Sequence, residues 1–91
     1  MPSVLVVDDE VSILDTLQIL LRGEGFDVTV AKSGREALER FEEASPDVVL
    51  TDIRMPGVTG LDLLAQIRER DPETPVILMT AQASLQSAVQ A

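Results

Sequence analysis

The hydrophobic positions of this chain change their spacing several times along its 91 residues. Short apolar runs, continuous or alternating, are typical of strands, whereas apolar residues three and four positions apart are typical of helices. The short runs predict strands over residues 4–7, 27–31, 47–51 and 76–79. Segments with helical spacing separate them and predict helices over residues 11–21, 33–45 and 59–70, with a last helix starting near residue 84.

Turn and capping residues support these boundaries. Gly23 and Gly25 follow the first helical segment and end it. The segment Ser33-Gly34-Arg35-Glu36 has the sequence of a capping box, and Thr59 can cap the third helix. The spacing also predicts the apolar side chains that face the sheet: Val11, Leu14, Leu17 and Leu21 in the first helix, Ala37, Leu38 and Phe41 in the second, and Leu61, Leu64 and Ile67 in the third.

Strands and helices therefore alternate along the chain, without an internal linker or repeat. Such alternation favours an α/β fold, an open and doubly wound parallel sheet with helices on both faces and right-handed crossovers. The strand at 4–7 is apolar throughout and is expected to be covered on both faces, whereas the alternating strand at 27–31 suits an edge. A chain of this length has room for one domain.

The charge balance and the missing residue types narrow the function. Seven basic and sixteen acidic residues give a net charge of −9, which argues against binding to nucleic acid or to an anionic membrane. No apolar run approaches the ~20 residues of a membrane-spanning helix, and the start of the chain lacks the basic region of a signal peptide. We therefore expect a cytoplasmic protein. Because cysteine and histidine are absent, carboxylates are the remaining groups for site chemistry.

Polar groups follow the predicted strands at the ends where α/β sheets bind ligands. Asp8, Asp9 and Glu10 follow the first strand, Asp52 follows the third and Thr80 follows the fourth. Carboxylates gathered at one rim repel one another unless a cation is present. With no histidine or cysteine, that cation should be one that prefers oxygen ligands, Mg²⁺ or Mn²⁺.

Each of these residues also has a simpler interpretation when it is taken alone. Asp8 and Asp9 could cap the first helix, Asp52 could be a loop residue, and Thr80 could be a cap or a hydroxyl at a strand end. Two adjacent carboxylates are more than one cap requires, however, and a third follows another strand. The combination therefore favours a cation site.

Four motifs resemble those of a known family: Val6-Val7-Asp8-Asp9-Glu10, Thr51-Asp52-Ile53-Arg54-Met55-Pro56-Gly57, Gly60-Leu61-Asp62 and Leu78-Met79-Thr80-Ala81. In this order and spacing they resemble the receiver domain of two-component response regulators, from about Val4 to the end of the chain. The segment around Asp52 is similar to receivers of the nitrogen-regulation type, which are attached to enhancer-binding transcription activators.

The resemblance implies a role for each matching residue. Asp52 would accept a phosphoryl group from a sensor histidine kinase, Asp9 would ligate Mg²⁺ directly and Asp8 mainly through water. The backbone carbonyl of Arg54 would complete the protein ligands, and the Thr80 hydroxyl would bind a phosphoryl oxygen and move as a switch. Such a module catalyses at most its own phosphorylation and dephosphorylation, and it regulates transcription through an output domain that this chain does not contain.

One departure from the family pattern changes the expectations. Receivers have a sheet of order 2-1-3-4-5, with a lysine at the end of the fifth strand and then a fifth helix. Here the only lysine is Lys32, which we interpret as a solvated charge. We therefore expect residues 1–91 to form a receiver domain of strand order 2-1-3-4, incomplete at its C-terminus and phosphorylated slowly. The apolar fourth strand would be an edge, which predicts a homo-oligomer formed through it.

Three other functions compete with phosphoryl acceptance. A receiver-like module could dimerise or bind a partner without being phosphorylated. A phosphohydrolase with an Asp nucleophile would carry a second acid two residues after Asp52, where Arg54 stands. A nucleotide-binding flavodoxin-like protein would need a phosphate loop after the first strand, where Asp8-Asp9-Glu10 would repel phosphate.

Overall fold

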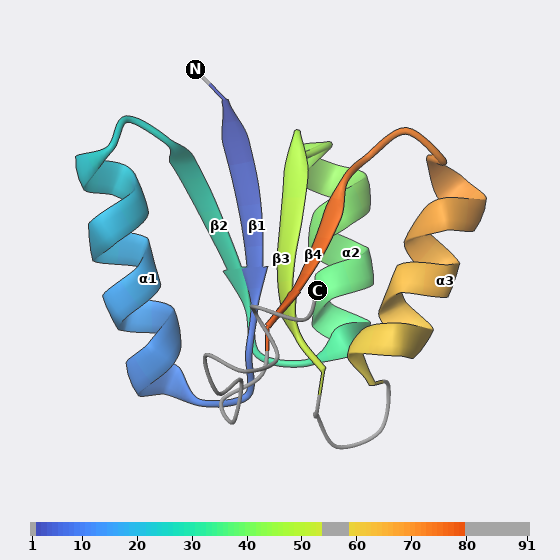
Figure 1. Cartoon of the computed structure of the whole chain (residues 1–91), viewed down its shortest axis with the longest axis horizontal. Helices are drawn as coiled ribbons and strands as arrows, with labels where there is room; N and C mark the ends of the chain where they lie inside the picture. Colours follow the sequence, from blue (N-terminus) through green and yellow to red (C-terminus); the bar gives the residue numbers. More distant parts are fainter. Residues whose placement is uncertain (1, 54–58, 80–91) are drawn as a thin grey trace, which may run out of the picture.

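Four parallel strands form the sheet at the centre of the computed structural model, which describes residues 2–53 and 59–79. The strands stand in the order β2-β1-β3-β4, and their carboxyl ends meet at the lower rim in Figure 1. This order confirms the predicted parallel sheet. The strands are β1 (Ser3–Val7), β2 (Asp27–Ala31), β3 (Val48–Asp52) and β4 (Val76–Met79).

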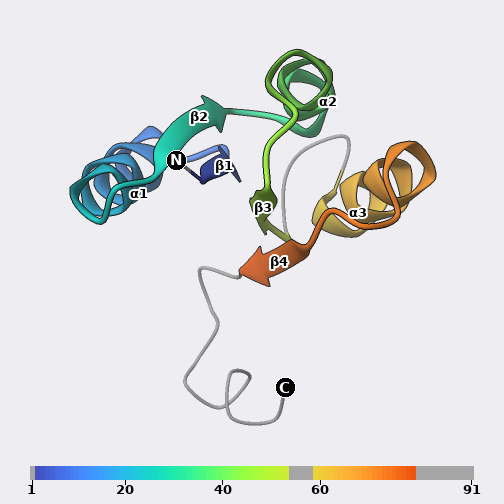
Figure 2. The same cartoon turned by 90° about the horizontal axis from the view of Figure 1, so that it is seen from above.

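Three helices cover the two faces of this sheet within the described residues: α1 (Val11–Gly23), α2 (Gly34–Ala44) and α3 (Gly60–Arg70). Seen along the strands, α1 lies on one face and α2 and α3 lie on the other (Figure 2). Among the residues described, no helix is long and apolar enough to cross a membrane.

The central strand β1 is buried on both faces, as its unbroken apolar sequence predicts. Leu5 and Val7 belong to the core beneath α2 and α3, and Val4 and Val6 belong to the core beneath α1. None of the four exceeds 4% exposure. Because β1 lies between β2 and β3, the residue that follows it emerges at the middle of the carboxyl rim.

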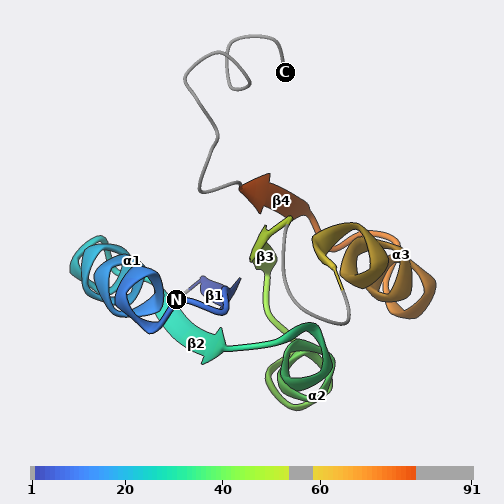
Figure 3. The same ribbon diagram turned by 90° about the horizontal axis from the view of Figure 1, so that it is seen from below.

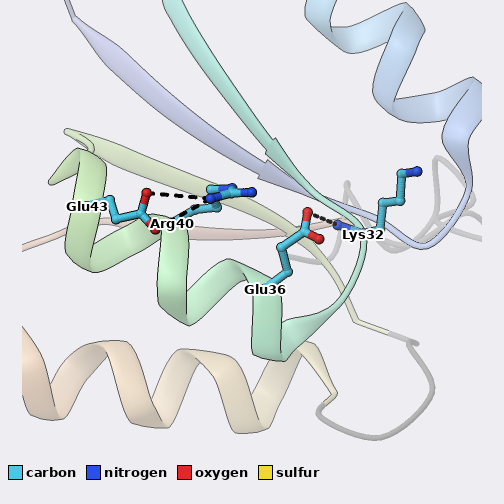
Figure 4. Close-up of polar contacts among 4 residues, drawn as sticks. All are labelled: Lys32, Glu36, Arg40 and Glu43. Carbon is cyan, nitrogen blue, oxygen red and sulfur yellow. Dashed lines mark hydrogen bonds and ion pairs between the residues drawn. The ribbon is translucent and has the colours of Figure 1, made fainter.

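The two predicted helix caps form differently. At α2, the Ser33 hydroxyl accepts a hydrogen bond from the Glu36 backbone N–H at 3.1 Å. The Glu36 carboxylate, however, accepts from the Lys32 backbone N–H at 3.2 Å (Figure 4), so the second half of the expected capping box reaches one residue further back. At α3, Thr59 and Asp62 form both halves of the box.

The predicted buried face of α3 is wrong at one position. Leu61 is 57% exposed, whereas Leu63 is fully buried with Ile67. Gly60, Leu63 and Ile67 lie on one stripe of the helix, and Gly60 packs directly against the backbone of β3. This contact turns the stripe that contains Leu63 towards the sheet. Val11, expected to face the core from α1, is likewise 49% exposed.

Candidate functional site

Three carboxylates from two neighbouring strands meet at the carboxyl rim. Asp8 follows β1, Asp9 comes next, and Asp52 is the last residue of β3. One carboxylate oxygen from each of the three lies within 4.8 Å of the others. Seen from below, β1 and β3 lie side by side at the centre of the sheet (Figure 3), so the topology brings together residues that are 43 to 44 positions apart.

Burial and neighbouring negative charges disfavour the ionised form of the Asp8 carboxyl. Its residue is 2% exposed, and burial raises the pKa of the carboxyl above its ordinary value. The negative charges of Asp52, Asp9 and Glu10 raise this pKa further, while a hydrogen bond from the Glu10 backbone N–H, 2.9 Å from Oδ1, opposes the rise. A buried carboxylate held among other carboxylates is a position that a cation would stabilise.

Replacing Asp8 with asparagine should stabilise the metal-free protein, because the amide oxygen can still accept the Glu10 hydrogen bond while the buried charge is removed. Each kcal/mol added to the free energy of unfolding raises the melting temperature of a domain this small by roughly 4–8 °C. We therefore expect the melting temperature of Asp8→Asn, measured in the presence of a chelator, to be a few degrees above that of the wild type. The control is Asp15→Asn on the exposed surface of α1, which should change little. A melting temperature for Asp8→Asn at or below that of the wild type would contradict this electrostatic account.

Backbone contacts fix the position of Asp52. The residue is 6% exposed, and the N–H of the following Ile53 donates to the Met79 carbonyl of β4 at 2.9 Å. The Thr51 hydroxyl donates to the Asp52 carbonyl at 3.1 Å. The strand end that presents this carboxylate is therefore attached to β4.

Asp9 is the exposed member of the cluster. The N-cap of α1 is Glu10, which makes no side-chain capping bond, and Asp8 rather than Asp9 bonds to the Glu10 N–H. Helix capping therefore accounts for one oxygen of Asp8 and does not account for Asp9. An exposed carboxylate beside two buried ones opens the cluster to solvent on one side.

The cluster fits a small divalent cation that binds oxygen. Mg²⁺ binds oxygen at 2.0–2.1 Å, so two oxygens bound to it are about 4.1 Å apart when they are opposite and about 2.9 Å apart when they are adjacent. The three carboxylate oxygens, within 4.8 Å of one another, would bind one ion either by moving closer together or through a water ligand between the ion and one of them. The exposure of Asp9 leaves room for the water ligands that Mg²⁺ usually retains.

Some residues of the predicted site and fold lie outside the described residues: Thr80, Arg54 and the expected last helix near residue 84.

Lys32, which follows the edge strand β2, is exposed. Its ammonium points away from Glu36 (Figure 4), and Glu36 instead binds the Lys32 backbone. These observations agree with the interpretation of Lys32 as a solvated charge.

Gly60, which the sequence analysis quoted only as part of the Gly60-Leu61-Asp62 motif and gave no role, is a contact residue of this site. It lies against the backbone of Asp52 and Ile53, where a side chain would overlap the strand. The available signal was a glycine at the first position of a helix, immediately after the Thr59 cap.

Comparison with known proteins assigns the chain to a family. The model of the response regulator receiver domain matches residues 4–91. This chain belongs to the response regulator receiver domain family. The resemblance of the four sequence motifs is thereby confirmed. The receiver matches the DNA-binding transcriptional regulator NtrC of Escherichia coli at 50% identity over 88 residues, which is 97% of this chain.

Solved structures match the receiver closely. The response regulator protein TrrA from Thermotoga maritima, in complex with Mg²⁺-BeF, has a TM-score of 0.87 and 39% identity, covering 96% of this chain and 76% of that chain. TrrA in complex with the histidine kinase ThkA has a TM-score of 0.85 and 39% identity, covering 92% of this chain and 72% of that one. The 91 residues span about a fifth of the length of NtrC, 19% of it.

Proposed function

We propose that this receiver accepts a phosphoryl group on Asp52 in the presence of Mg²⁺ or Mn²⁺ and thereby switches its interactions with partners. The observation that carries the proposal is the carboxylate cluster, in which Asp8, Asp9 and Asp52 bring oxygens within 4.8 Å of one another at the ends of adjacent strands. Membership of the receiver family supports the same assignment. In this role the chain is a phosphoacceptor and catalyses at most its own phosphorylation and dephosphorylation.

The covalent step uses one Asp52 carboxylate oxygen as the nucleophile. This oxygen forms a bond to phosphorus as the bond between phosphorus and the donor breaks, and the bonding electrons leave with the donor group. With acetyl phosphate the leaving group is acetate, and with a phosphorylated histidine it is the imidazole. The product is an acyl phosphate, whose phosphoryl group carries about −1.5 to −2 charge in place of the single negative charge of the carboxylate.

A bound Mg²⁺ would offset the charges of the carboxylates and of the transferring phosphoryl oxygens. Asp9 would hold it directly, Asp8 mainly through water, and Asp52 through the oxygen that does not attack phosphorus. The Arg54 carbonyl would add a ligand, and the Thr80 hydroxyl would bind a phosphoryl oxygen and move after phosphorylation. The last two roles rest on the sequence motif alone.

The phosphoryl donor that suits this receiver is a sensor histidine kinase. The similar protein TrrA forms a complex with the histidine kinase ThkA. The similar protein NtrC is a DNA-binding transcriptional regulator of which a receiver of this size makes up about a fifth. We propose that this receiver acts in the cytoplasm and controls transcription through an output domain of that kind, with no direct contact between the receiver and DNA.

Incubation with acetyl phosphate tests the proposed function. Intact-mass spectrometry of the wild type should detect one added phosphoryl group per chain when Mg²⁺ is present and none when a chelator replaces it. An unmodified wild-type mass at millimolar Mg²⁺ would favour the alternative, a receiver fold that binds partners without being phosphorylated.

We also propose that the 91-residue chain associates with a second copy through β4. Within the described sheet β4 pairs with β3 alone, so one side of its backbone has no strand partner there. Ile77 at its centre is 54% exposed, and the strand carries no charge. An apolar edge of this kind offers N–H and C=O groups to another strand.

Light scattering over a concentration series measures this association. We expect the average mass of the wild type to rise above 9.8 kDa with concentration. Ile77→Lys places a charge on the edge and should keep the chain monomeric, because charged side chains block pairing between edges. Its control is Leu61→Lys, an equally exposed apolar position on α3, which should leave the association unchanged. A wild type that stays monomeric, or two variants with the same behaviour, would refute association through β4.

A further inference from the structure

The first residue of α3 lies in direct contact with the strand end that carries Asp52. A Cβ atom at Gly60 would overlap the Asp52 carbonyl oxygen and would lie 2.8 Å from the Ile53 Cα. Real Cβ atoms essentially never come this close to other atoms, so a side chain here would force a displacement. The atoms in contact belong to the backbone and cannot move aside by a change of rotamer.

Helix α3 is firmly attached on its side of this contact. Its N-terminus is held by the capping box of Thr59 and Asp62. Leu63 and Ile67 have no exposed surface and anchor the helix in the core beneath the sheet. A hydrogen bond from the Gly60 N–H to the Ile53 carbonyl, at 2.9 Å, joins the helix to the strand end. Moving the helix away would disturb the packing of Leu63 and Ile67 and the hydrogen bond from Gly60 to Ile53.

The strand end forms the other side of this contact. The last residue pair between β1 and β3 is Val7 with Thr51, and Asp52 lies opposite Met79 of β4. Because a Cβ at Gly60 would meet the backbone atoms of Asp52 and Ile53 themselves, part of any displacement that it forces falls on the strand end. That backbone carries the carboxylate that meets Asp8 and Asp9.

We propose that Gly60 is a positioning residue for the carboxylate cluster. Its lack of a side chain lets α3 hold the Asp52 backbone where the carboxylate reaches the other two. Residues that orient metal ligands without touching the metal typically change metal affinity 10- to 100-fold when they are replaced. We expect Gly60→Ala to weaken Mg²⁺ binding by about the same factor. The inference rests on the proposed function only in that Asp52 takes part in the cation site.

The test measures Mg²⁺ affinity by calorimetry and the melting temperature in parallel. Gly23→Ala is the matched control, because a Cβ at Gly23 meets no atom within 4 Å and should leave the affinity unchanged. Leu63→Ala is the second control. It removes a fully buried anchor of α3 but adds no atom against Asp52, so it should lower the melting temperature while it retains the wild-type affinity.

The outcomes separate positioning from mere stability. A loss of about tenfold or more in Gly60→Ala, with Leu63→Ala unchanged, would support positioning. Equal losses of Mg²⁺ affinity in Gly60→Ala and Leu63→Ala would overturn it, as would wild-type affinity in Gly60→Ala.

If Gly60→Ala is unfolded in dilute buffer, the titration is run in sucrose, which favours the folded state. A chain that stays unfolded there while Leu63→Ala folds would also overturn the proposal, because Gly60 would then be a requirement for folding. Failure of the wild type to bind Mg²⁺ would instead count against the proposed function.

Discussion

Replacing Asp52 with asparagine is expected to abolish phosphoryl transfer to this receiver. The amide has almost the same shape as the carboxylate, so the strand end and its hydrogen bond to Met79 should persist. The amide oxygen is a far weaker nucleophile than a carboxylate oxygen and cannot form the acyl phosphate. After incubation with acetyl phosphate and Mg²⁺, the intact mass of the variant should therefore stay that of the unmodified chain.

Asp62→Asn provides the matched control for this substitution. Asp62 is an exposed carboxylate in the capping box of α3, on the element that packs against Asp52 but outside the carboxylate cluster. This variant should be phosphorylated like the wild type, with at most a small loss of stability from the altered cap. Phosphoryl uptake by Asp52→Asn equal to that of Asp62→Asn would contradict the assignment of Asp52 as the acceptor.

Truncating Asp9 should remove most of the stabilisation that Mg²⁺ confers. A ligand that binds only the folded state, at a concentration one hundred times its dissociation constant, adds about 2.7 kcal/mol to the free energy of unfolding. In a domain of this size, that gain raises the melting temperature by roughly 10 °C or more. Asp9 is exposed, so Asp9→Ala should fold like the wild type in the absence of metal. Because the variant lacks the carboxylate proposed to bind Mg²⁺ directly, its melting temperature should respond weakly to millimolar Mg²⁺.

The measurement for Asp9 is a thermal melt followed by circular dichroism, since the chain has no tryptophan or tyrosine for fluorescence. Asp15→Ala removes an exposed carboxylate from α1, outside the cluster, and should respond to Mg²⁺ as the wild type does. If Asp9→Ala gained as many degrees from Mg²⁺ as Asp15→Ala, Asp9 would not be a ligand.

The sequence was sufficient to predict the strands and the meeting of the carboxylates. Residues 4–7 and 76–79 are apolar runs too short for helices, and the alternation of strands with helices leaves few arrangements for the sheet. Once β1 and β3 are neighbours, Asp8, Asp9 and Asp52 must emerge at the same rim. The carboxylate cluster could be predicted because it follows from the topology of the sheet.

Details that depend on how backbones approach each other could not be predicted in this way. Leu61 and Leu63 are both leucines two positions apart, and helical spacing alone does not decide which one faces the sheet. The contact of Gly60 with Asp52 makes that choice, and it involves backbone atoms that leave no hydrophobic pattern. The bond from the Lys32 N–H to Glu36 similarly depends on the path of the chain before α2.

Locating the phosphoryl group on the chain tests the central claim most directly. Borohydride reduces an aspartyl phosphate to homoserine, and peptide mass spectrometry can then identify the converted residue. After treatment with acetyl phosphate and Mg²⁺, the receiver is expected to contain homoserine at position 52 and unmodified aspartate at positions 8 and 9. Homoserine at position 8 or 9, or none in the chain, would contradict the claim that Asp52 is the phosphoacceptor of this site.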